Sequence, residues 1–109
     1  MKDNWDSMLK IAQEAVENGS VDAKLLKILL EQVTIDRELL LDDEHQPVIQ
    51  ALCSIDIDKK LVEQMSKNKT GRDLIVNFYE ELQRRFTEEQ KTLLDDIFAE
   101  VTEWVKQQK

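Results

Sequence analysis

The chain has 109 residues, of which 41% are apolar and 35% are charged, and its formal net charge is −8. A chain of this length fits one domain and can bury a self-sufficient core. The composition is too apolar for a disordered chain and too charged for a membrane-embedded protein. We therefore expect a soluble, globular single domain over residues 1–109.

Apolar runs and cysteine content bear on where the protein works. The longest apolar clusters, at residues 25–30 and 39–41, fall far short of the roughly 20 residues that a membrane-spanning helix needs. The N-terminus lacks the hydrophobic run of a secretory signal. The single cysteine, Cys53, forms no internal disulfide and favours a reducing compartment. These features predict a cytoplasmic protein with no membrane contact, although a processed secreted chain also fits.

Glycine and proline are scarce, at two residues and one residue, which favours long helices over strands joined by tight turns. From Trp5 to Val16, apolar side chains recur at i, i+3, i+4 and i+7. Asn18-Gly19 then supplies a C-terminal stop. We expect a first helix over about residues 4–18.

The next segment carries an unusually broad apolar stripe. Ser20 can cap this helix, with Asp22 in its positively polarised first turn. The stripe over residues 25–41 predicts a central helix and leaves homodimerisation open. Adjacent β-branched residues around Thr34 mildly disfavour helix, so residues 21–45 form either one helix or two.

Proline and capping residues divide the middle of the chain. A polar turn at residues 42–46 leads through Pro47 into a short amphipathic helix over about 48–55. Asp56 or Asp58 can cap a further helix. That helix carries Leu61, Val62 and Met65 on its apolar side.

Two capping signals mark the last helices. Residues 66–71 form the clearest loop, and the capping-box-like residues 70–73 predict a helix that continues to about Arg85. Residues 87–90 match the capping box outright, with apolar residues following at helical spacing. The whole pattern predicts an all-α fold, a compact bundle of five or six helices.

Charge is distributed unevenly along the chain. Residues 1–58 carry 13 acidic and 5 basic side chains, a net of −8, whereas residues 59–109 carry 10 of each. An acidic surface repels phosphates, so direct binding to DNA or RNA is not expected. The first half could attract a basic partner or imitate a nucleic-acid backbone. The simpler interpretation is that its charge keeps a small domain soluble.

The densest acidic segment supplies the first candidate residues for partner binding. These are Asp36, Glu38, Asp42, Asp43 and Glu44. The adjacent His45 has no spaced histidine or glutamate partner, and the EF-hand pattern is absent. We therefore expect no bound metal and no cofactor.

A basic loop and one tryptophan complete the candidates. Lys67, Lys69 and Arg72 surround a predicted helix start, where backbone N–H groups favour an anion or an acidic partner. The simpler interpretation is a solvated loop. Trp5 and Trp104 lie on apolar stripes near opposite chain ends, so the first and last helices can pack together and bury both. Alternatively, Trp104 anchors a partner, because tryptophan is enriched at interface hot spots.

Motifs for catalysis are missing. The E-E-x-x-E pattern of all-helical nucleotide pyrophosphohydrolases begins at Glu80-Glu81 but fails at Arg84. A chain with one histidine cannot supply the two E-x-x-H sets of a di-iron bundle. Cys53 beside an apolar stripe is typical of a small buried side chain. Neither a phosphate-binding glycine loop nor a nucleophile elbow occurs.

Three functional hypotheses follow. The leading one is a non-enzymatic helical module that regulates, inhibits or assembles a partner protein through a helix face or groove. The second is an acidic mimic or decoy that blocks a DNA- or RNA-binding protein, and it requires the acids of residues 36–44 to line one convex face. The third is a small carboxylate-dependent hydrolase, which requires a cleft where carboxylates from three helices converge.

Overall fold

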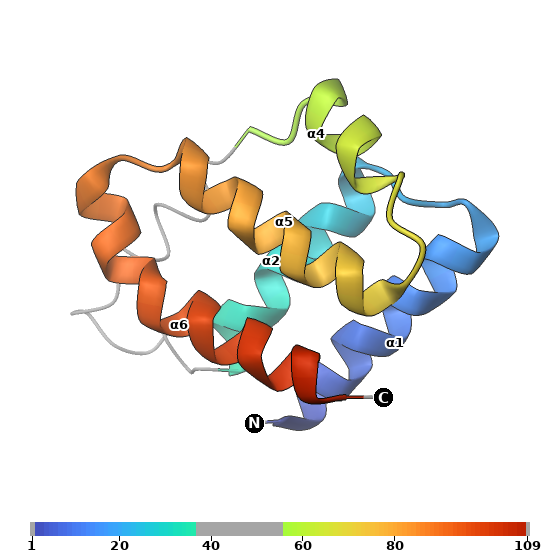
Figure 1. Cartoon of the computed structure of the whole chain (residues 1–109), viewed down its shortest axis with the longest axis horizontal. Helices are drawn as coiled ribbons and strands as arrows, with labels where there is room; N and C mark the ends of the chain where they lie inside the picture. Colours follow the sequence, from blue (N-terminus) through green and yellow to red (C-terminus); the bar gives the residue numbers. More distant parts are fainter. Residues whose placement is uncertain (1, 37–55, 109) are drawn as a thin grey trace.

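Five helices make up the described part of the chain. The computed structural model describes residues 2–36 and 56–108, and these residues contain no strand. The helices are α1 (Lys2–Asn18), α2 (Ala23–Asp36), α4 (Lys59–Met65), α5 (Gly71–Arg85) and α6 (Glu88–Gln107). They pack around one hydrophobic core as an all-α bundle (Figure 1), which confirms the predicted fold class. The short helix expected over 48–55 lies outside the described residues.

α1 ends at a glycine in the left-handed conformation. Gly19 has φ of 67°, which costs glycine little because it has no Cβ. The Ser20 N–H donates to the Ala15 carbonyl at 2.9 Å, and the Gly19 N–H donates to the Val16 carbonyl at 3.4 Å. This pair of hydrogen bonds is a Schellman motif, and it confirms the predicted stop after Asn18.

The predicted cap of the second helix needs a correction. α2 begins at Ala23, and Asp22 rather than Ser20 caps it, because Asp22 Oδ1 accepts a hydrogen bond from the Leu25 N–H at 2.8 Å. Ser20 instead takes part in the motif that closes α1. The helix continues through Thr34, so no break occurs at that residue. The rest of the segment over residues 21–45, predicted as one helix or two, lies outside the described residues.

The three later helices begin at capping residues that the sequence identifies. Asp58, Thr70 and Thr87 each accept a hydrogen bond from the backbone N–H three residues ahead, at 2.8, 3.1 and 3.2 Å. Gln90 Oε1 also accepts from the Thr87 N–H at 3.1 Å, which completes a capping box. Because α5 begins at Gly71, the predicted loop is one residue shorter than expected.

α5 has the most extensive packing among the described helices. It lies between α4 and α6 and also packs on α1 (Figure 1), whereas α2 packs mainly on α1 and α4. Among the described helices, α5 therefore packs on more neighbours than the broadly apolar second helix does. The leucines of α2 are nonetheless buried in the shared core, namely Leu25, Leu26, Leu29 and Leu30.

Tyr79 links α5 to the helices around it. Its ring stacks on Phe98 of α6, with centroids 4.7 Å apart, and its hydroxyl donates to the Leu29 carbonyl of α2 at 2.9 Å. The same oxygen lies 3.3 Å from Met8 Sδ of α1. Burial raises the pKa of this phenol well above its usual range, so the side chain stays neutral.

α1 and α5 approach each other closely at Gly71. A Cβ at this position would lie 2.4 Å from the backbone nitrogen of Gln13 and 2.7 Å from its Cα. The Gly71 N–H donates to Gln13 Oε1 at 2.7 Å. The first residue of α5 therefore has to be a glycine for this crossing to form. None of the described helices combines the length and apolarity needed to span a bilayer.

Candidate functional site

The start of α1 and the end of α6 meet at a shallow hollow, which we call the indole hollow. Its volume is about 220 Å³, and its lining residues are Trp5, Glu100, Glu103, Trp104 and Gln107. The two indole rings lie edge to face, with centroids 5.7 Å apart and planes at 63°. The two tryptophans therefore contact each other as predicted, but only Trp5 is buried. The first and last helices meet mainly at this point, since α1 packs chiefly on α2 and α5.

The two tryptophans are buried to different extents. Trp5 is 2% exposed and lies at the base of the hollow, whereas Trp104 is half-buried. Trp104 stays partly accessible because its helix neighbours Val101 and Val105 are the residues that turn fully into the core. The hollow thus presents one indole to solvent on a rigid, buried support.

The indole nitrogen of Trp5 is an unusual feature of this support. Trp5 Nε1 is buried and finds no hydrogen-bond acceptor among residues 2–36 and 56–108. Most buried donors in proteins are paired, and leaving one unpaired costs about 1–3 kcal/mol. A buried donor without a partner, in a ring that lines a hollow, is a reason to consider a ligand there.

Carboxylates dominate the solvent side of α6. Its exposed acidic residues are Glu88, Glu89, Asp95, Asp96, Glu100 and Glu103. Residues 87–108 carry six acidic and two basic side chains, a net of −4, whereas residues 59–86 carry four acidic and seven basic, a net of +3. The electroneutral second half of the chain therefore divides into an acidic helix and a basic region around α4 and α5.

The basic loop residues do not gather into one site. Lys67 and Lys69 are exposed, and Lys67 lines a hollow of about 380 Å³ between α4 and α5. Arg72 lines a different groove of about 400 Å³ beside α1, and its Nη1 donates to the backbone carbonyl of Gln108. Lys67 and Arg72 therefore face separate depressions.

The helix start beside this loop already uses most of its backbone donors. The Gly71 N–H donates to Gln13, the Asp73 N–H to the Thr70 hydroxyl, and the Leu74 N–H to the Thr70 carbonyl. An anion at a helix N-terminus binds to such N–H groups when they are free. The geometry therefore favours the solvated-loop interpretation over an anion site.

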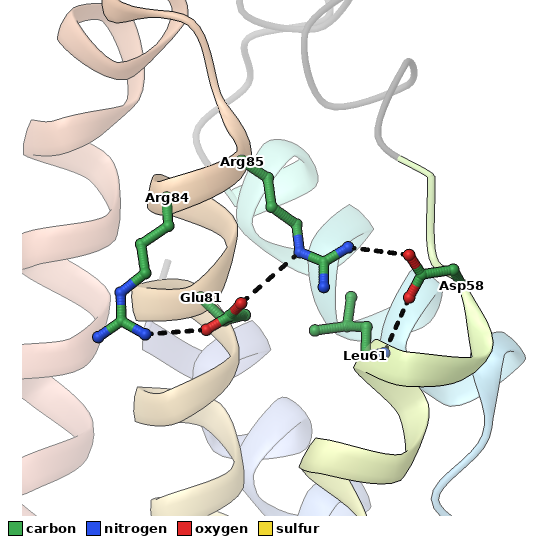
Figure 2. A network of polar contacts seen from close by, with 5 residues as sticks. All are labelled: Asp58, Leu61, Glu81, Arg84 and Arg85. Carbon is green, nitrogen blue, oxygen red and sulfur yellow. Dashed lines mark hydrogen bonds and ion pairs between the residues drawn. The ribbon is translucent and has the colours of Figure 1, made fainter.

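Arg84 and Arg85 belong to a polar network that joins α5 to the start of α4 (Figure 2). Arg84 Nη1 lies 3.0 Å from Glu81 Oε2, and Arg85 Nη1 lies 3.2 Å from Asp58 Oδ2. Arg85 Nε also lies 3.8 Å from Glu81 Oε1. Both arginines are thus matched by carboxylates and add little to a basic surface.

Asp58 has two roles in this network. It accepts the Leu61 N–H at the start of α4, and it faces Arg85 across the helix junction. The hydrogen bond from Leu61, followed by the one from Arg85, lowers the pKa of the Asp58 carboxyl below its usual value of 3.8. Asp58 is therefore ionised at neutral pH.

Most of the acidic candidate segment lies outside the residues that the structure describes. Asp36 is the last residue of α2, and the other members, Glu38, Asp42, Asp43 and Glu44, lie outside the described residues, as do His45 and Cys53. Whether these acids line one face stays a prediction. In residues 2–36 and 56–108, no three His, Cys, Asp or Glu side chains are grouped so that they could hold a metal ion.

The sequence pattern pointed to Trp104 as a candidate anchor but not to the acids around it. Residues 100, 103, 104 and 107 share one side of a helix, and this spacing was the available signal.

Comparison with protein-family models, curated proteins and solved structures finds no match to the chain. The chemistry of the indole hollow is therefore the basis for a functional conclusion.

Proposed function

We propose that this protein is a non-enzymatic helical module that regulates, inhibits or assembles a partner protein, which it binds through the surface around Trp104. The observation that carries the proposal is a half-buried indole at a hollow, supported from beneath by the buried Trp5. Tryptophan dominates many interfaces because its large ring buries much area at low entropic cost. A cytoplasmic location is part of the same proposal.

The charge on α6 favours a second candidate, the acidic mimic. Exposed carboxylates from Glu89 to Glu103 run along about 21 Å of helix, at a rise of about 1.5 Å per residue. Such a row could occupy a basic nucleic-acid-binding groove. Unlike the segment over residues 36–44, this row lies within the described helices.

The proposal is tested by capturing partners from a lysate of the native cells with three immobilised proteins. These are the unmodified chain, Trp104→Ser and the control Val62→Ser, which alters a half-buried apolar residue on α4. We expect at least one protein to be retained by the unmodified chain and by the control but lost with Trp104→Ser. Circular dichroism verifies that all three are folded.

Repeating the capture at raised salt separates the two candidates. Binding that depends on the Trp104 ring is lost with Trp104→Ser at either salt concentration, whereas binding through the row of carboxylates alone is unaffected by Trp104→Ser and weakens steeply as ions screen it. If all three immobilised proteins retain the same partners, the surface around Trp104 is not the binding site. Complete loss in salt, with no effect of Trp104→Ser, would favour the mimic.

A further inference from the structure

We propose that the indole hollow binds an arginine side chain carried by a basic peptide segment of the partner. This inference rests on the proposed function, because it names the chemical group that the surface around Trp104 recognises. Three features of the hollow carry it: an accessible aromatic ring, acidic residues at its edge, and an unpaired donor in the ring at its base.

The aromatic ring favours a cation. A guanidinium or ammonium group placed over an indole face is attracted by the negative potential of the π system, and tryptophan is the best of the aromatic residues at this. Trp104 is half-buried and so retains accessible ring surface, while its edge-to-face contact with Trp5 holds it in place. A rigid ring loses little entropy when the ligand binds.

The rim of the hollow favours a positive charge in the same place. Glu100 and Glu103 contribute carboxylates, and Gln107 contributes an amide oxygen. This part of the chain has a net charge of −4 over residues 87–108, so its field also attracts a basic segment. Arginine suits the site better than lysine because its planar guanidinium can stack on an indole while donating hydrogen bonds to a carboxylate at its edge.

The buried donor favours a peptide over a free cation. Trp5 Nε1 has no acceptor in the part of the chain that the structure describes, and an isolated ammonium or metal ion has none to offer. A peptide that places an arginine in the hollow also brings backbone carbonyl oxygens. Because this nitrogen is buried, one of these oxygens accepts its hydrogen bond only if the Trp5 ring turns toward the hollow on binding, which would remove the cost of an unpaired donor.

The experiment titrates the ¹⁵N-labelled protein with a short glycine peptide that contains one arginine. Trp5 and Trp104 are the only tryptophans, so the spectrum contains two indole N–H signals, both from the hollow. We expect both signals to shift saturably. The citrulline peptide, which has nearly the same shape but no charge, should leave them unchanged, and the lysine peptide should bind more weakly.

Two variants and a matched control locate the effect. Trp104→Leu keeps an apolar side chain but removes the π face, and Glu103→Gln removes one carboxylate at the rim. Each should weaken binding by between about twofold and thirtyfold. Glu89→Gln removes one negative charge from the same helix, 11 residues and about 16 Å before Glu100, at a rise of about 1.5 Å per residue. It should leave the dissociation constant within about twofold, since an exposed charge at that distance is screened.

The outcomes separate this inference from the proposed function. Equal binding of the arginine, lysine and citrulline peptides, or equal effects of Glu103→Gln and Glu89→Gln, would overturn the assignment to arginine. A partner lost with Trp104→Ser, from a protein that does not bind the arginine peptide, would leave the module intact and refute only the ligand. Arginine binding without any partner dependent on Trp104 would refute the module instead.

Discussion

At the scale of single residues, the two glycines are needed for different structural reasons. Gly19 adopts a positive φ in open space, so the backbone conformation alone favours glycine there. Gly71 is fixed instead by a neighbouring helix, because any side chain would meet the backbone of Gln13. Both glycines lie at helix ends, but only Gly71 is required by a contact with another helix.

Replacing Gly71 with alanine should destabilise the protein by about 1–3 kcal/mol, the usual cost of inserting a methyl group into a packed contact. The opposing backbone can yield only by moving α1 away from α5. The sign is informative because alanine in a helix is otherwise favoured over glycine by about 1 kcal/mol. Urea denaturation followed by circular dichroism measures the change.

Gly19→Ala serves as the comparison for this variant. It should also destabilise, by about 1–2 kcal/mol, but through left-handed backbone strain. Only Gly71→Ala should shift the amide resonance of Gln13. Unchanged or increased stability of Gly71→Ala would show that the two helices are farther apart than described.

At the scale of helices, local capping and a contact across a helix junction cooperate. α4 has only seven residues, a length at which an isolated helix does not form in water. It is held by the packing of Leu61 and Met65 and by Asp58, which caps the helix and pairs with Arg85 of α5 (Figure 2). The short helix therefore depends on its neighbour.

This arrangement predicts a specific pH response. The folded-state pKa of Asp58 lies below the unfolded value, so its stabilising contribution is present above about pH 4 and is lost as the pH falls through the folded pKa. Arg85→Gln should raise the Asp58 pKa. The pKa should stay below 3.8, because the larger cause is the hydrogen bond from Leu61.

A carboxyl ¹³C titration of the two proteins by NMR measures this shift. Arg84→Gln is the matched control, since Arg84 contacts Glu81 and not Asp58. It should leave the Asp58 titration where it is. An Asp58 pKa that is unchanged by Arg85→Gln, or that changes equally with Arg84→Gln, would refute the ion pair between Asp58 and Arg85.

At the scale of the molecule, charge is sorted by structural element. The acidic α6 and α4, which begins with two lysines, lie on opposite sides of α5 (Figure 1), while the whole chain carries −8. A compact protein with this much net charge repels itself more than its unfolded chain does. Added salt should therefore favour the folded state.

Raising sodium chloride from about 10 mM to about 150 mM shortens the screening length from about 30 Å to about 8 Å. We expect the free energy of unfolding, measured by urea denaturation, to increase. The double variant Asp95→Asn/Asp96→Asn should show a smaller increase, because two of the repelling charges are gone. A decrease in stability with salt would mean that attractive ion pairs outweigh the repulsion.

The sequence by itself determined the helical class and most helix ends. Asp58, Thr70 and Thr87 act on backbone groups three residues away, and Gly19 acts within one turn, so their roles are local and legible in the chain. The sequence did not decide between Asp22 and Ser20 as the cap of α2. That choice depended on the turn after α1, in which the Ser20 N–H donates to α1 while Asp22 caps α2.

Only the tertiary structure decided which residues share a surface. It turned Arg84 and Arg85 toward carboxylates, separated Lys67 from Arg72, and set Trp104 over Trp5 beside the acids of α6. Helical periodicity gives the face on which a side chain lies but not the helix that it meets. Which helices pack together depends on contacts such as the close approach of α1 to Gly71, and these contacts join residues that are distant in the chain.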